Sequence, residues 1–251
     1  MVTNAEVTAA SAEPPQMNFL QRLSGIYFEP GKTFQDINRK SSWLAMFIIV
    51  SLLGMATLYV VNTRVPYELR IRKQMEMSPI KLSEEQIQKM VEAPPSPIRD
   101  NLGLALVPLG VLVSYLILAG IFLLAFVIAG ASIKYKKALA FTFWGMGPPS
   151  IVYSLVGIVM MYIKSPQTIE INPAKNVASN LGVLVSDKAH PVLASLLGSI
   201  DIFSVWTVAL LAIGFAIASN GKVSTKKAAV IFAVLWGILI LGKMGWAAIF
   251  G

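Results

Sequence analysis

The chain has 251 residues, of which 55% are hydrophobic and 14% charged, and it carries a net charge of +8. Soluble globular chains carry about 25% charged residues, so this composition excludes a wholly water-facing surface. The excess of lysine and arginine fits the positive-inside rule of membrane proteins. We therefore expect no nucleic-acid partner. Cysteine is absent and His190 is the one histidine, which excludes disulfides, thiolate metal sites and histidine clusters, and we expect no metal or cofactor.

The N-terminal 17 residues are small and polar, without periodic apolar positions. A disordered tail is therefore predicted for residues 1–17, and no secretory signal peptide is recognisable there. We expect residues 18–250 to form one membrane domain.

Two short amphipathic helices are predicted before the first long apolar stretch. In residues 18–28 apolar side chains recur at helical spacing, and Arg22 is expected on the polar face that turns away from them. Pro30 breaks this helix, and a second amphipathic turn carries Phe34. Two placements stay open: both helices lie in the membrane interface, or both pack under the membrane-spanning helices.

Five later stretches are long and apolar enough to cross a hydrocarbon core. They cover approximately residues 43–61, 102–129, 138–163, 201–219 and 227–250. We therefore predict an all-α integral membrane protein, a bundle of five transmembrane helices with interfacial N-terminal amphipathic helices. The third stretch contains Pro148 and Pro149, which remove two backbone donors, so a kink or a break is expected there.

The loop 64–101 between the first two stretches is expected to be helical. Ser83 and Gln86 have the spacing of a capping box, and Ile87, Met90 and Val91 form an apolar stripe behind it. Such a helix must rest its apolar face on the membrane surface, on the other outer loop or on a partner.

The distribution of lysine and arginine predicts the orientation. Three basic residues lie in each of the turns 131–137 and 220–227, and four lie before the first stretch. The segment 164–200 has three, and the seven in the long loop 64–101 are offset by six acids. The positive-inside rule then places the N-terminus in the cytoplasm and the C-terminus outside.

Few residues suggest chemistry. Asp201 begins the fourth stretch, and Lys243 lies in the outer half of the fifth. The two residues could form an ion relay or a structural ion pair. Alternatively, Asp201 caps its own helix and Lys243 reaches outward to water. Ser186, Asp187 and His190 lie within five residues of one another, which is typical of a polar loop rather than of a catalytic triad. We therefore expect no catalytic site and no enzyme.

Several short segments, taken in order, resemble the Yip domain family, named for interaction with Ypt/Rab GTPases. Pro30 followed by Thr33-Phe34 resembles the start of that domain. The segment from Asp201 to Trp206, followed by Leu210-Leu211-Ala212-Ile213-Gly214, resembles its fourth-span signature, and the basic turn at 226–227 and the third-span prolines fit as well. The resemblance covers roughly residues 19–250 and implies five spans with a cytoplasmic N-terminus.

The resemblance implies a multi-pass scaffold that binds lipids and partner membrane proteins. The short tail and structured outer loop are closer to bacterial members, some of which are thought to assist ABC-type export systems, so we expect the bacterial inner membrane and no Rab-type GTPase partner. The alternative is a small transporter or channel that uses the proline-broken third span together with Asp201 and Lys243.

Overall fold

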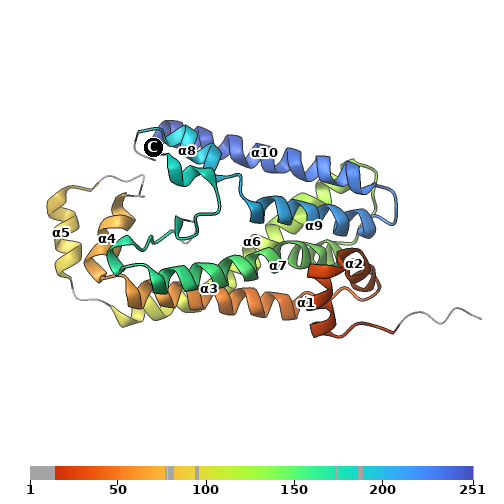
Figure 1. Ribbon diagram of the computed structural model, residues 1–251, viewed down its shortest axis with the longest axis horizontal. Helices are drawn as coiled ribbons and strands as arrows, with labels where there is room; N and C mark the ends of the chain where they lie inside the picture. Colours follow the sequence, from red (N-terminus) through yellow and green to blue (C-terminus); the bar gives the residue numbers. More distant parts are fainter. Residues whose placement is uncertain are drawn as a thin grey trace, which may run out of the picture.

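The computed structural model describes residues 15–76, 78, 82–93, 96–172, 175–185 and 189–250. Nearly all of the predicted tail, residues 1–14, lies outside this part of the chain. Helices dominate the described residues, and no strand occurs among them (Figure 1). In chain order they are α1 (Phe19–Phe28), α2 (Pro30–Arg39), α3 (Leu44–Arg64), α4 (Tyr67–Glu76), α5 (Glu84–Glu92), α6 (Pro97–Ile128), α7 (Tyr135–Ile163), α8 (Pro191–Gly198), α9 (Ile202–Ala218) and α10 (Thr225–Phe250), with 3₁₀ turns η1 (Pro166–Thr168) and η3 (Leu181–Leu184).

Four of the described helices, α3, α6, α7 and α10, are long and apolar enough to cross a membrane. The fourth predicted stretch forms α9, which has 17 residues and is therefore about 25 Å long at 1.5 Å per residue. The chain is thus an all-helical membrane bundle, as its composition predicts.

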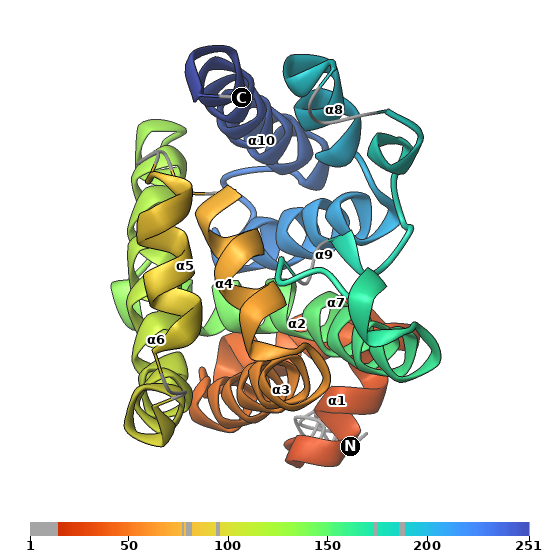
Figure 2. The same cartoon turned by 90° about the vertical axis from the view of Figure 1, so that its left-hand side faces the viewer.

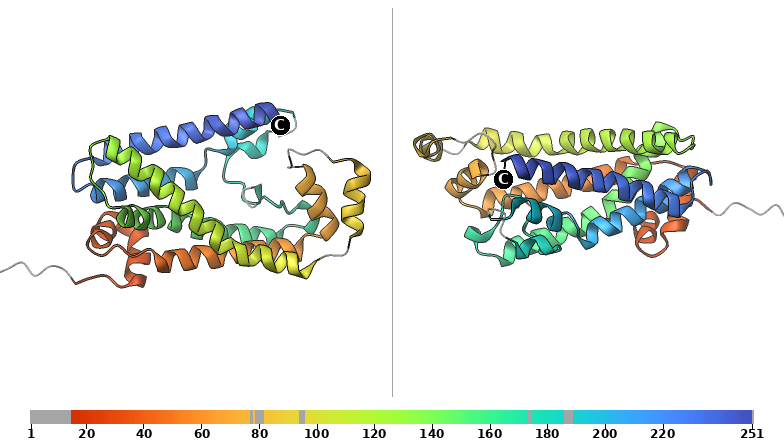
Figure 3. Two further views of the ribbon diagram at one scale, coloured as in Figure 1. Left: turned by 180° about the vertical axis from the view of Figure 1, so that it is seen from behind. Right: turned by 90° about the horizontal axis from the view of Figure 1, so that it is seen from above.

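The long helices run back and forth along one axis (Figures 1 and 3). Helices α1 and α2 and the turns 129–134 and 219–224 lie at one end of the bundle, which we call the N-terminal end. Helices α4 and α5 lie at the opposite end, together with the last turn of α10 (Figure 1). We call this the α4–α5 end. The three segments with the densest basic residues therefore share one end.

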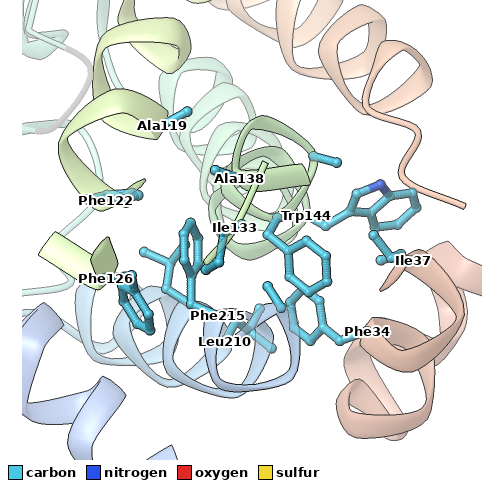
Figure 4. Packing of buried hydrophobic residues seen from close by; sticks show 14 of the residues in the cluster. Phe34, Ile37, Ala119, Phe122, Phe126, Ile133, Ala138, Trp144, Leu210 and Phe215 are labelled. Atoms are coloured by element: carbon cyan, nitrogen blue, oxygen red, sulfur yellow. The ribbon is translucent and has the colours of Figure 1, made fainter. Parts of the chain in front are cut away.

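Aromatic side chains fill the bundle towards its N-terminal end (Figure 4). Phe126 of α6 lies 5.0 Å from Phe215 of α9, and Phe215 lies 5.3 Å from Phe232 of α10, measured between ring centroids. Phe122 of α6 contacts the rings of Phe215 and Phe232 as well. Aromatic pairs at this spacing add to the free energy of burial, so α6, α9 and α10 are held together by one shared cluster.

Helix α7 is one uninterrupted helix through Pro148 and Pro149. Of the expected kink or break in the third span, the break is therefore wrong, and the kink stays a prediction. Both prolines are buried in a helix whose first half is almost entirely enclosed by its neighbours, so packing on all sides holds the helix together despite the two missing backbone donors.

The fourth predicted stretch, residues 201–219, forms the uninterrupted helix α9, and a further apolar helix, α8, precedes it. Helix α8 has 8 residues and α9 has 17, and residues 199–201 separate them. Figures 1 and 2 show α8 beside one part of α10 and α9 beside another. Leu196 of α8 and Met244 of α10 line a common surface hollow, while Phe215 of α9 touches Phe232 near the start of α10. Together α8 and α9 follow the length of α10, which has 26 residues.

At the α4–α5 end the predicted capping box is confirmed. The backbone N–H of Gln86 donates to Ser83 Oγ, and Gln86 Oε1 accepts from the backbone N–H of Ser83. Helix α5 lies beside α4, where the Tyr67 hydroxyl donates to the carbonyl of Met90. The stripe Ile87, Met90 and Val91 is partly buried.

Candidate functional site

The residues that carry the family resemblance meet where α1 and α2 sit on the bundle. We call α1, α2 and the turn between them the N-terminal hairpin. Phe34 of α2 is fully buried, and its ring stacks on Phe141 of α7 with centroids 5.4 Å apart. A Cβ atom at Gly214 of α9 would lie 2.8 Å from Phe34 Cε1. Glycine at position 214 is therefore what lets the Phe34 ring approach the α9 backbone.

A second contact lies nearer the turn of the hairpin. The Tyr27 hydroxyl donates to the carbonyl of Pro148 at 3.2 Å, and the Tyr27 ring lies 5.6 Å from Trp206 of α9. Burial raises the pKa of the Tyr27 phenol above its ordinary value of 10.0, so the hydroxyl stays protonated and able to donate near neutral pH. Two signature segments, at Pro148 and Trp206, thus bind the same side chain of α1.

The centre of the hairpin is a buried ion pair. Arg22 Nε donates to Asp36 Oδ2 at 2.7 Å, and the two side chains are 5% and 6% exposed. Arg22 also donates to Ser42 Oγ and to the carbonyl of Lys40, while the backbone N–H of Met17 donates to Asp36 Oδ1. The pair therefore joins α1, α2 and the segment that leads into α3.

The prediction that Arg22 turns away from the apolar face is wrong. Phe19, Arg22, Leu23 and Ile26 follow helical spacing i, i+3, i+4, i+7, which places Arg22 on the face that packs. That spacing is the signal that sequence reasoning missed. This face of the hairpin packs on α7 and α9, as the second open placement expects. A position in the membrane interface stays a prediction, and Leu20 and Phe28 on the hairpin are exposed.

Trp144 of α7 fixes the end of the hairpin segment. Its indole Nε1–H donates to the carbonyl of Ser42 at 2.7 Å, and its ring lies 5.8 Å from Phe19. The ordered chain from Met17 to Ser42 is thus held at α1, at α2 and at the residue before α3. Pro30 begins α2, where the missing N–H of proline costs no hydrogen bond.

Asp201 and Lys243 are not brought together as an ion pair among the described residues. Asp201 caps α9: its Oδ1 accepts from the backbone N–H of Ser204 at 2.6 Å, and its backbone pairs with Asn180. Lys243 is exposed on α10. The capping alternative is therefore the one seen for Asp201.

The α4–α5 end holds further ion pairs, each between different segments. Arg70 of α4 pairs with Asp100 of α6 at 3.4 Å, and Lys73 pairs with Glu170 at 3.2 Å. These contacts tie α4 to the start of α6 and to the segment after α7.

Of the suggested triad, His190 is exposed, whereas Ser186 and Asp187 lie outside the described residues. Within the described part of the chain, no three His, Asp or Glu side chains gather in a way that could hold a metal ion.

Comparisons with known proteins identify the family of the chain. The model of the Yip1 domain matches residues 24–246. The chain is similar to "Membrane protein YknW" of Bacillus subtilis (strain 168), with 26% identity over 242 residues that cover 96% of this chain and 94% of the relative. No solved structure matches the chain. The match begins within α1 and ends within α10, so it covers most of the chain, and the chain belongs to the Yip1 domain family.

Proposed function

We propose that this protein is a non-enzymatic scaffold that binds partner membrane proteins within the bilayer. One observation carries the proposal: aromatic side chains fill the interior between α2, α6, α7, α9 and α10, while large apolar side chains cover the outer faces of α6 and α10. A bundle of this kind offers binding surface on its outside and close packing within.

The family membership supports the same class of function. A bacterial relative is itself a membrane protein, and we infer that the partner is another membrane protein of the bacterial inner membrane, with an ABC-type export system as the specific candidate. We propose no Rab-type GTPase as a partner. The orientation that we propose has the N-terminal end in the cytoplasm, because the basic turns 131–137 and 220–227 lie there with the hairpin.

The orientation is tested by labelling, which a cysteine-free chain makes simple. Lys222 and Lys175 are both exposed. Lys222 belongs to the turn 219–224 at the N-terminal end, and Lys175 belongs to the segment after α7, which the Lys73–Glu170 ion pair ties to α4. In intact cells, an impermeant maleimide should label the Lys175→Cys variant and leave Lys222→Cys unlabelled until the membrane is opened. The reverse pattern would overturn the proposed orientation.

The scaffold role is tested by photo-crosslinking in native membranes. Ile117 of α6 and Ile238 of α10 are each 59% exposed, whereas Ala119 of α6 is fully buried and serves as the matched control. A photoreactive phenylalanine at 117 or 238 should yield a reproducible adduct with a membrane protein, and one at 119 should not. If neither exposed position gives an adduct above the control, the scaffold proposal fails.

The transporter alternative makes a different prediction. Asp201→Asn and Lys243→Met should abolish an ion- or substrate-dependent activity and leave the crosslinked adduct intact if the two residues serve transport. We expect instead that Lys243→Met leaves the adduct and the fold unchanged, since Lys243 is exposed. Asp201→Asn should also leave both unchanged, because the asparagine side-chain oxygen can accept the same hydrogen bond from Ser204 and cap α9.

A further inference from the structure

The segment between α7 and α9 has a surface unlike that of a water-exposed loop. From Leu181 onwards it presents large apolar side chains: Leu181 is 61% exposed, Leu184 79% and Leu193 46%. The first residue of α9 continues this surface, with Ile202 71% exposed. Exposed apolar side chains that are contiguous rather than scattered mark a surface that another apolar phase covers.

The position of α8 indicates which phase that is. Leu193 and Leu196 of α8 lie around the same hollow as Met244 of α10. Met244 is six residues before the end of α10, or about 9 Å along the helix, so α8 lies beside the membrane-spanning part of α10 rather than beyond it. The outer face of α10 is itself apolar and exposed, at Val234, Ile238 and Leu241 among others. The apolar surface of α8 therefore continues the apolar outer face of a helix that is long and apolar enough to cross a membrane.

Polar groups in this segment are satisfied locally. Ser199 Oγ donates to the carbonyl of Ser195, and Asp201 accepts from the backbone N–H of Ser204. Between η3 and the first turn of α9, the described ionisable side chains are His190 and Asp201, and the sequence also has Asp187 and Lys188 there, outside the described residues. Non-helical backbone is tolerated at membrane depth where protein covers it, and here η3 closes over the end of α8: a Cβ atom at Gly182 would lie 2.8 Å from Gly198 Cα.

We propose that η3 and α8 lie within the bilayer leaflet at the α4–α5 end, with acyl chains covering Leu181, Leu184, Leu193 and Ile202. The fourth pass then consists of α8 and α9 in succession, interrupted at residues 199–201. Its two parts together match α10, which neither matches alone. The partner of this surface is lipid, and its recognition is hydrophobic.

Fluorescence quenching in reconstituted vesicles tests this placement, independently of which way the protein is inserted. Single cysteines replace Leu184 or Leu193 in the otherwise cysteine-free chain, and each is labelled with bimane. Val234→Cys on the lipid-facing side of α10 is the membrane control, and Gln167→Cys in the exposed turn η1 is the aqueous control. The vesicles are phosphatidylcholine with or without brominated acyl chains, and iodide is supplied on both sides.

Brominated lipid should quench the labels at 184 and 193 to a degree comparable with the label at 234, and iodide should quench only the label at 167. Iodide quenching at 184 and 193 equal to that at 167 would overturn the proposal. Protection of both labels from both quenchers would overturn it too, because the surface would then be covered by protein, such as a second copy of this chain. Both replaced leucines are exposed, so neither change empties the core.

Discussion

At the scale of single residues, the N-terminal hairpin contains a buried ion pair between two residues that lie 14 positions apart in the sequence. Arg22 and Asp36 are both almost fully removed from solvent. Removing one partner leaves the other buried and uncompensated, which costs far more than the net contribution of the pair itself. Asp36→Asn should therefore lower the free energy of unfolding by about 3–5 kcal/mol.

Thermal unfolding of the purified protein in detergent measures this loss. Glu29→Gln is the matched control: Glu29 pairs with Lys32 on the exposed side of the same hairpin, and breaking such a pair costs about 0–1 kcal/mol. The double variant Arg22→Met with Asp36→Leu should recover much of the loss, because it removes both charges together. Equal effects of Asp36→Asn and Glu29→Gln would contradict the buried pair.

Tyr27 gives the hairpin a pH dependence. Its raised pKa means that the folded chain binds the phenolic proton more tightly than the unfolded chain, so this contribution to stability is complete below about pH 10 and is lost as the pH rises through the raised pKa. Tyr27→Phe should cost about 0.5–1.5 kcal/mol at neutral pH by removing the hydrogen bond to Pro148. The gap between the two proteins should narrow above about pH 10; a gap that is constant with pH would refute this role.

At the scale of elements, the close approach of α2 to α9 rests on one missing side chain. A methyl group at position 214 would meet the rings of Phe34 and Phe141, at 2.8 Å and 3.0 Å. Both rings are fully buried, so neither can swing away into solvent. Gly214→Ala should destabilise the protein by about 1–3 kcal/mol, as overpacking does.

Limited proteolysis at the hairpin, together with thermal unfolding, checks the result. Gly237→Ala on α10 is the control, because nothing lies within 4 Å of a Cβ atom there. Adding Phe34→Leu to Gly214→Ala should restore part of the stability by removing the ring edge that the methyl group meets. If Gly214→Ala and Gly237→Ala behave alike, the hairpin is not held at this contact.

The elements that sequence alone predicted are those whose signal is local. A long apolar stretch and the Ser83 to Gln86 capping box can each be recognised from consecutive residues of the sequence. Helix α8 was missed because eight apolar residues are too few to indicate a membrane helix, and only its position beside α10 shows what they do. The possible break at Pro148 and Pro149 was wrong for a similar reason. Whether α7 stays continuous there depends on the helices packed around it, which the local sequence does not show.

The candidate site divides in the same way. Pro30, Phe34 and Trp206 could be named in advance because short segments around them resemble a family pattern. Tyr27 and Asp36 could not, since their importance arises from partners more than ten residues away along the chain.

At the scale of the whole molecule, the number of passes determines where the two chain ends lie. Helix α9 is about 25 Å long, shorter than a hydrocarbon core of about 30 Å, whereas α8 and α9 together suffice. We therefore expect an odd number of passes, with the termini on opposite sides. Reporter fusions that are active on one side of the membrane only should give opposite readouts at the N- and C-termini; equal readouts would show that the fourth stretch does not cross.

The contact between Phe34 and Gly214 also limits how early the N-terminal hairpin can dock during synthesis of the protein. The two residues are 180 positions apart, as 214 less 34 gives. At roughly 5–20 residues per second, the ribosome needs on the order of ten to forty seconds after producing α2 before the site that receives it has been synthesised. During that interval Arg22 and Asp36 can pair with each other, with Arg39 and with nearby polar groups, but α9 has not yet been synthesised. We therefore expect the N-terminal hairpin to be among the last parts of the chain to pack in its native position.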